Sequence, residues 1–241
     1  MAPIMVLLCA RSERIQIIKT ETENKDYRLG ILLSVLGALL LSTKGIFAKI
    51  LYDNGADYES VTVVRAILSI PLFWMWYFMR RKKTIQSISK DSLFIILLAG
   101  FIAYYFGALI NFYALTMIDA SIERLILYSF PAIVIVFKSL QKKTMPSKNM
   151  MLVLMVIYLG LFLTVGIGNQ ALMMQNFYGG LLVFVSTITI SIYFLLNEKY
   201  GQEIGSITFT TIAMTGATVS LFVHATLTNN LSWMTWSSEM W

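Results

Sequence analysis

The residues best suited to chemistry in this sequence are ionisable side chains inside apolar stretches: Lys44, Arg65, Glu123 and Arg124. A charged side chain near the centre of a bilayer costs roughly 2.5–3.5 kcal/mol on insertion scales, so each such residue is a functional hypothesis by default. Lys44 and Arg65 would form a polar outer vestibule that attracts an anionic or zwitterionic solute. Glu123, the single carboxylate within these stretches, would pair with these two cations or carry a proton. The alternative is a structural ion-pair cluster that holds three helices together.

Two of the cations lie closer to the ends of their stretches. Lys49 and Arg124 are within about one helical turn of the outer end, where a long side chain can extend to the membrane interface. Asn111 and Tyr113 offer hydrogen bonds either to a solute or to a neighbouring helix. The same two interpretations apply to four hydroxyl residues of a later stretch, Ser186, Thr187, Thr189 and Ser191.

Two prolines interrupt apolar stretches. Pro71 and Pro131 cannot donate a hydrogen bond to the residue four positions earlier, so they free the carbonyl groups of Ile67 and Leu127. Unwound points at mid-depth often mark solute sites in transporters, although neighbouring helices also tolerate such kinks. Pro131 is therefore the stronger site candidate of the two.

Metal and enzyme chemistry have little support. With one His and one Cys in the chain we expect no metal site, no cofactor and no intrachain disulfide. His224, near the end of the last stretch, is more typical of a packed or interfacial residue than of a proton relay. The sequence has no Gly-x-Ser-Gly, no paired His and no paired intramembrane Asp, so we expect no enzymatic centre.

The elements that must position these residues are helices that cross a membrane. Of the 241 residues, 57% are hydrophobic and 13% are charged, and the mean hydropathy is +0.71. Seven apolar stretches are close to the ~20 residues that a helix needs to span the hydrocarbon core, and in hydrocarbon the backbone must satisfy its own hydrogen bonds. These predicted spans are Leu29–Leu51, Ser60–Phe78, Ser92–Leu115, Ser121–Leu140, Asn149–Ile167, Tyr178–Leu196 and Ile207–Leu227. The predicted fold class is an all-α integral membrane protein.

The basic residues predict the orientation of these spans. Most of the 19 Lys and Arg residues fall in the N-terminal arm and in every second gap, including the run Arg80–Lys83. The positive-inside rule makes this side cytoplasmic, so the N-terminus should be inside and the C-terminus outside the cell membrane. The formal net charge of +6 follows from this topology, and we expect the lipid bilayer, not a nucleic acid, as the partner.

An internal repeat is visible at an offset of 150 residues. At this offset the sixth and seventh spans align with the first two, and five pairs are identical: Gly30/Gly180, Leu32/Leu182, Val35/Val185, Lys49/Lys199 and Gly55/Gly205. Five spans separate the copies, so the second would be inverted, as in secondary transporters. The predicted organisation is a cytoplasmic arm (1–28), a first five-helix repeat (29–167), a partial second repeat (178–227) and a short extracytoplasmic tail (228–241).

Three sequence segments resemble the EamA group of the drug/metabolite transporter superfamily. The segment Leu41–Lys49 resembles the exit of that family's first span, and Arg65 matches its Arg early in the second. Tyr113-Ala-Leu115, Asp119-Ala-Ser121 and Pro131 resemble its signature across the third and fourth spans. The resemblance covers about Gly30 to Val223.

The resemblance implies a membrane carrier, a secondary transporter that is an exporter or permease of small metabolites or drugs, often with protons as the coupling ion. Family members have ten helices in two inverted five-helix repeats, so this chain resembles that fold truncated after the second helix of repeat two. If closure around the solute requires both halves, the chain alone would be inactive. The family's Trp-Gly pair is replaced here by Leu41-Ser42.

Other classes of protein explain the pattern less well. A seven-helix receptor would place its N-terminus outside, opposite to the charge bias, and a retinal-binding one would need a Lys in the last span. A non-transporting seven-helix protein, remnant or membrane partner has the same predicted topology as a carrier. A homodimer is compatible with all of these.

The orientation is testable with a reporter fused to the C-terminus. We expect activity from a reporter that works only outside the cytoplasm, because seven crossings starting inside end outside. A strong signal from a cytoplasmic reporter at this position would contradict the predicted topology.

Overall fold

A computed structural model describes residues 31–80 except 33, 34, 38, 41 and 42, together with 88–143, 148–164 and 170–236. The chain divides into two compact units, Met1–Lys44 and Gly45–Trp241. The described residues of the first unit are helical, and the second unit contains every element discussed below. The predicted arm (1–28), the pair Leu41-Ser42 and most of the basic run Arg80–Lys83 lie outside the described residues.

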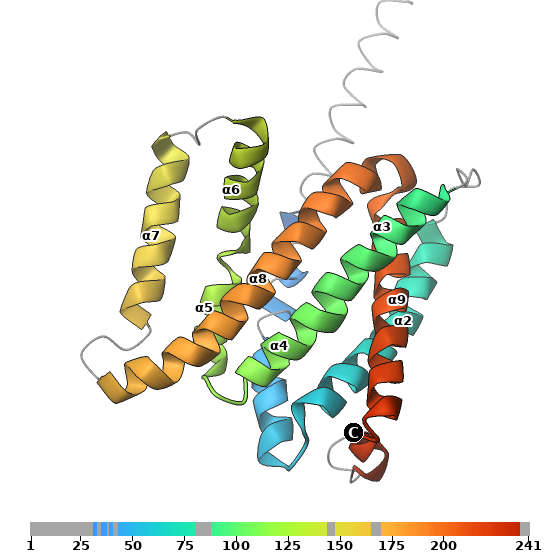
Figure 1. The fold of residues 1–241 in the computed structure, drawn as a ribbon, viewed down its shortest axis with the longest axis horizontal. Coiled ribbons are helices and arrows are strands. Elements are labelled where there is room, and N and C mark those ends of the chain that lie inside the picture. Colours follow the sequence, from blue (N-terminus) through green and yellow to red (C-terminus); the bar gives the residue numbers. More distant parts are fainter. Residues whose placement is uncertain are drawn as a thin grey trace, which may run out of the picture. The chain divides into compact units, whose positions relative to one another are not determined.

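The regular elements of the described residues are all helical (Figure 1). Residues 45–53 form a helix in the second unit, and a turn joins it to the next element. The later elements are α2 (Tyr58–Arg80), α3 (Lys90–Gly100), η1 (Phe101–Phe106), α4 (Gly107–Ala114), α5 (Ala120–Leu127), α6 (Phe130–Lys142), α7 (Lys148–Thr164), α8 (Gln170–Ile204), α9 (Ser206–Leu227) and η2 (Ser232–Thr235).

Among the described residues, five helical segments are long and apolar enough to cross a membrane: Tyr58–Met79, Lys90–Ala114, Ala120–Gln141, Asn176–Ile204 and Ser206–Leu227. They confirm the second, third, fourth, sixth and seventh predicted spans. The first and fifth predicted spans, Leu29–Leu51 and Asn149–Ile167, extend beyond the described residues, although α7 is helical over most of the latter. The protein is an all-helical integral membrane protein.

The third span runs between α8 and α9 as α3, η1 and α4 in succession (Figure 1). Two glycines permit close approach on this span. A Cβ at Gly100 would lie 2.2 Å from the carbonyl oxygen of Ala213 on α9, and one at Gly107 would lie 2.1 Å from Oγ1 of Thr189 on α8. Small residues at such contacts let helices pack by dispersion, which is the main attraction between helices in lipid.

The π-helical segment η1 was not predicted from the sequence. Its wider turn changes which side chains face each neighbour. Ala103 and Tyr104 pack in a cluster with residues of α3, α8 and α9, whereas Tyr105 packs in a cluster between α2 and α9. A single π turn is a recurrent feature of functional helices, and here it lets one span contact three others.

The two prolines behave differently. The fourth span is interrupted between α5 and α6 at Tyr128 and Ser129, and Pro131 lies in the first turn of α6, as predicted. The predicted break at Pro71 is wrong, because α2 continues through this residue from Tyr58 to Arg80. Pro71 is exposed, so packing does not force the backbone apart there, and only the bond to the Ile67 carbonyl is lost.

Gly55 and Gly205, paired by the sequence repeat, share an unusual backbone conformation. Their φ angles are 88° and 87°, and both precede a long helix. This left-handed conformation favours glycine because a Cβ would be strained there. The two corners therefore share a backbone feature at the offset that the repeat predicts.

Adding one methyl group at Gly100 tests the contact between α3 and α9. We expect Gly100→Ala to destabilise the fold by about 1–3 kcal/mol, because the new Cβ meets backbone atoms that cannot rotate away. The matched control is Gly160→Ala in α7, where no atom lies within 4 Å of the added Cβ. Thermal unfolding in detergent micelles measures both, and equal effects of the two variants would contradict the tight contact.

Candidate functional site

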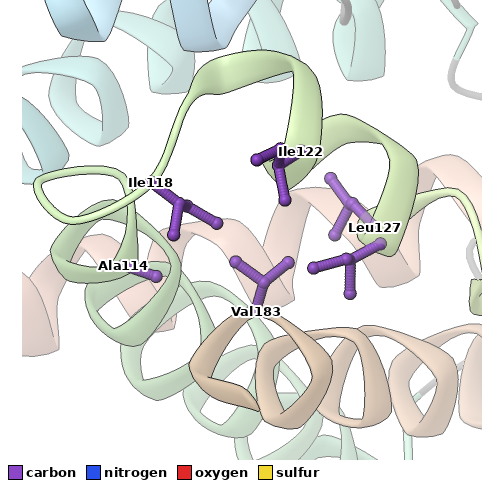
Figure 2. Close-up of a cluster of buried hydrophobic side chains, with 6 residues drawn as sticks. Ala114, Ile118, Ile122, Leu127 and Val183 are labelled. Carbon is purple, nitrogen blue, oxygen red and sulfur yellow. The ribbon is translucent and has the colours of Figure 1, made fainter. Parts of the chain in front are cut away.

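The helix α5, which carries Glu123 and Arg124, is held by a cluster of buried apolar side chains (Figure 2). Ile122 and Leu127 of α5 point toward Val183 of α8, with Ala114 and Ile118 beside them. Burying a side chain of this size contributes about 1.5–3 kcal/mol in water; in lipid, tight packing takes over this role. The cluster consequently fixes the rotation of α5 and the direction of its charged side chains.

Glycines bring other helices close to α5 and to the turn before it. A Cβ at Gly179 of α8 would lie 2.4 Å from Cγ2 of Ile118, and one at Gly45 would lie 3.0 Å from the Cβ of Ala120. The same added Cβ at Gly45 would lie 3.6 Å from Oε2 of Glu123. The carboxylate of Glu123 therefore faces the helix of residues 45–53.

Glu123 and Arg124 form an ion pair inside the protein. Nε of Arg124 lies 3.1 Å from Oε2 of Glu123, and the two side chains are 9% and 0% exposed. Consecutive residues of a helix do not normally face each other, so burial of both directs the two side chains into one polar region. The interface position considered for Arg124 is wrong, because this side chain is enclosed by protein.

The guanidinium of Arg124 has further donors to satisfy. Among the described residues its Nη1 and Nη2 atoms are buried and have no hydrogen-bond partner, and its Nε contacts Glu123 without hydrogen-bond geometry. A buried donor without a partner costs roughly 1–3 kcal/mol, and more when the group is charged. Such a group in a native structure requires an explanation, for example a ligand or a water.

Arg65 of α2 supplies a second cation to this region. Its guanidinium lies over the ring of Phe112 at 5.2 Å from the centroid, a contact that stabilises the charge by the ring quadrupole. The predicted pairing of Arg65 with Glu123 is wrong: Arg65 makes no ion pair with any described residue, and its Nε is buried without a partner. Arg65 and Arg124 are close enough to act on each other electrostatically.

The structure brings together some of the other predicted residues but not all. Asn111 is buried on α4, next in sequence to Phe112. Tyr113 is instead exposed at the end of α4, where its ring lies 5.1 Å from that of Tyr58. Lys44 belongs to the first compact unit.

The hydroxyl residues of α8 are engaged by backbone carbonyls. Ser186 donates to the carbonyl of Gly107 at 2.8 Å across the helix contact, and Thr187, Thr189 and Ser191 donate to carbonyls of α8 itself. Of the two predicted roles, the structure supports packing and backbone bonding for these four residues.

Pro131 lies in a separate cavity of about 450 Å³ between α6 and α8. Its lining is mostly apolar and comprises Phe130, Pro131, Val134, Ile135, Phe194, Asn197, Glu198 and Ser206. Lys138 and Glu198 form an ion pair between the same helices at 2.6 Å. Asn197 was not singled out from the sequence. The available signal was its position four residues after Tyr193, whose hydroxyl forms a hydrogen bond with that of Thr210 at 2.7 Å.

At the N-terminal end of α2, Asp57 joins the helix to the segment after α9. Its Oδ2 accepts from the backbone nitrogen of Ser60 and from Nδ2 of Asn230, both at 2.9 Å, and Oδ1 accepts from the Ser232 hydroxyl. Asp57 is therefore an N-cap of α2 as well as a tertiary contact. Burial would raise the pKa of its carboxyl, but the bonds from Ser232, Ser60 and Asn230 outweigh it and hold the pKa below the ordinary value.

Apolar helices with ionisable groups enclosed between them define a polytopic membrane protein with a polar interior. Residues 28–166 match the EamA-like transporter family, and the chain belongs to this family. It is 25% identical over 204 residues to the uncharacterized transporter YcbK of Bacillus subtilis (strain 168), a match that covers 85% of this chain and 65% of that protein. No solved structure matches the chain.

The Asp57 contact predicts a pH-dependent stability. Asp57→Ala should lower the free energy of unfolding by about 1 kcal/mol at pH 7, because it removes an N-cap. The lowered pKa means that the ionised carboxylate stabilises the fold above its ordinary pKa, and that this contribution disappears as the pH falls through the folded-state value. Unfolding midpoints in detergent at pH 7 and pH 3 measure the effect.

Asp53→Ala is the matched control, since Asp53 is an exposed carboxylate of the same gap. We expect it to leave the midpoint unchanged at both pH values. A difference between wild type and Asp57→Ala that is as large at pH 3 as at pH 7 would contradict the role of the charge.

Proposed function

We propose that the protein is a secondary carrier of small metabolites or drugs whose solute site includes Arg65, Glu123 and Arg124. The observation that carries the proposal is this buried charged cluster, in which cations outnumber the carboxylate in the second unit. Membership of the EamA-like transporter family and the name of the Bacillus subtilis relative support the same role. The chain spans about two thirds of that relative, so the activity of a complete carrier is part of the proposal.

A buried cluster of charges is an energetically costly way to hold helices together. Breaking a buried pair by removing one partner typically costs 3–5 kcal/mol, while an apolar replacement of the whole pair is often neutral or stabilising. A fold that needed only contact between α2, α4 and α5 would be served by apolar residues. The presence of two guanidinium groups and one carboxylate therefore supports a solute-handling role.

The finer features of the proposal follow from chemistry and charge. Glu123 is the candidate for proton coupling, because a buried carboxylate beside an Arg can change charge state as a solute binds. The basic gaps support a carrier in the cell membrane with a cytoplasmic N-terminus and an extracytoplasmic C-terminus. We also propose that the protein acts by transport and not as an enzyme, and that it forms a homodimer.

Replacing Arg65 tests the site. We expect Arg65→Ala and Arg65→Leu to reduce transport about tenfold or more, because a hydrogen bond to a charged group contributes roughly 1.5–3 kcal/mol. The measurement is counterflow of labelled amino acids, organic acids and sugars into liposomes that contain the full chain. Folded yield by size-exclusion chromatography accompanies each variant.

Lys90→Gln serves as the control of equal charge, because Lys90 is exposed at the start of α3. Transport that survives in well-folded Arg65 variants would remove Arg65 from the site. A wild-type chain that moves none of the solutes would favour the non-transporting membrane protein.

A further inference from the structure

The unpartnered edge of Arg124 points to the chemical class of the solute. Its Nε lies 3.1 Å from Oε2 of Glu123 and forms an ion pair with it that lacks hydrogen-bond geometry. The two Nη atoms form the opposite edge of the planar guanidinium, and both are buried without a partner among the described residues. This edge presents parallel N–H donors at the spacing of the two oxygens of a carboxylate.

The charges around this edge favour an anion. Within the second unit, Arg65 and Arg124 contribute two positive charges to the cluster and Glu123 contributes one negative charge. The other polar group that acts on Arg65 is the Tyr104 hydroxyl, which is neutral near pH 7. A bound carboxylate would balance the excess positive charge.

The burial of the two cations bears on how strongly they would bind a ligand. Arg124 is 7% exposed, so a ligand there would be almost fully desolvated, which strengthens charge-assisted hydrogen bonds. Arg65 is partly buried with its Nε enclosed, and its guanidinium lies over the ring of the buried Phe112. Two cations in one cluster suit a solute that carries an anionic group.

We propose that the solute is an organic carboxylate, either an anion or a zwitterion, whose carboxylate binds the Nη edge of Arg124, with Arg65 as the second cation. Glu123 is a positioning residue, because its ion pair with Nε lies on the side of the guanidinium opposite to the Nη edge. This inference rests on the proposed carrier function and names the substrate class of the same site.

Matched pairs of ligands test the class. The probes are acetate, succinate and benzoate, each compared with its neutral amide at equal ionic strength. Binding to the full chain in detergent is measured by the rise in unfolding temperature, since a ligand of the folded state stabilises it in proportion to its occupancy. We expect at least one carboxylate to raise the midpoint and its amide to have no effect.

Variants of Arg124 locate the site. Arg124→Lys keeps the positive charge beside Glu123 but lacks the planar pair of donors, so we expect about tenfold weaker carboxylate binding or more. The double variant Arg124→Gln with Glu123→Gln removes both charges together and so avoids an unpaired buried charge; we expect it to fold and to lose carboxylate binding. Lys90→Gln should bind as the wild type does.

Two results would overturn the inference: amides that stabilise as well as carboxylates, or carboxylate binding that is unchanged in both Arg124 variants. Failure of the carrier function gives a different pattern. A chain that transports solutes without binding carboxylates contradicts this inference alone. A chain that binds carboxylates through Arg124 without moving them across liposomes contradicts the carrier function alone.

Discussion

A charge enclosed within apolar helices is stable only where neighbouring groups compensate it, and this constraint determines the arrangement around α5. Glu123 and Arg124 are adjacent in sequence and both buried, so they must point into one protein interior. That direction depends on the apolar cluster between α4, α5 and α8, which fixes the rotation of α5. The same constraint explains why Arg65, which has no carboxylate partner in the described chain, lies over an aromatic ring.

The close helix contacts depend on glycines, which have no side chain. At Gly100 and Gly107 a single added carbon would overlap atoms of α9 and α8. In lipid, where apolar side chains gain little by leaving the solvent, such dispersion contacts and bonds like Ser186 to the Gly107 carbonyl hold helices together. Between the two glycines, η1 distributes its side chains over three neighbours. The helices around the charged cluster are therefore held together by close contacts at which one helix has no side chain.

Much of the fold could be predicted from the sequence. Five spans were correct because a continuous apolar run of the right length has one stable form in hydrocarbon, and Pro131 marked the break between α5 and α6 because the chemistry of proline is local. Pro71 has the same chemistry, yet α2 continues through it. The ion pair of Glu123 with Arg124 could not be predicted, because Lys44 and Arg65 are also within plausible reach when helix rotation is unknown.

The sequence alone determined membrane residence, most of the spans, the candidate ionisable residues and the resemblance to EamA transporters, because each depends on residue types and their order along one chain. The tertiary structure decided that Arg124 is buried, that Arg65 lies over Phe112, that the hydroxyls of α8 bond to backbone, and that Tyr113 is exposed. These outcomes depend on the rotation and separation of helices distant in sequence. Contacts such as Val183 with α5 and Gly100 with Ala213 determine the rotation and the separation of the helices. These contacts cannot be deduced from the residue spacing within one helix.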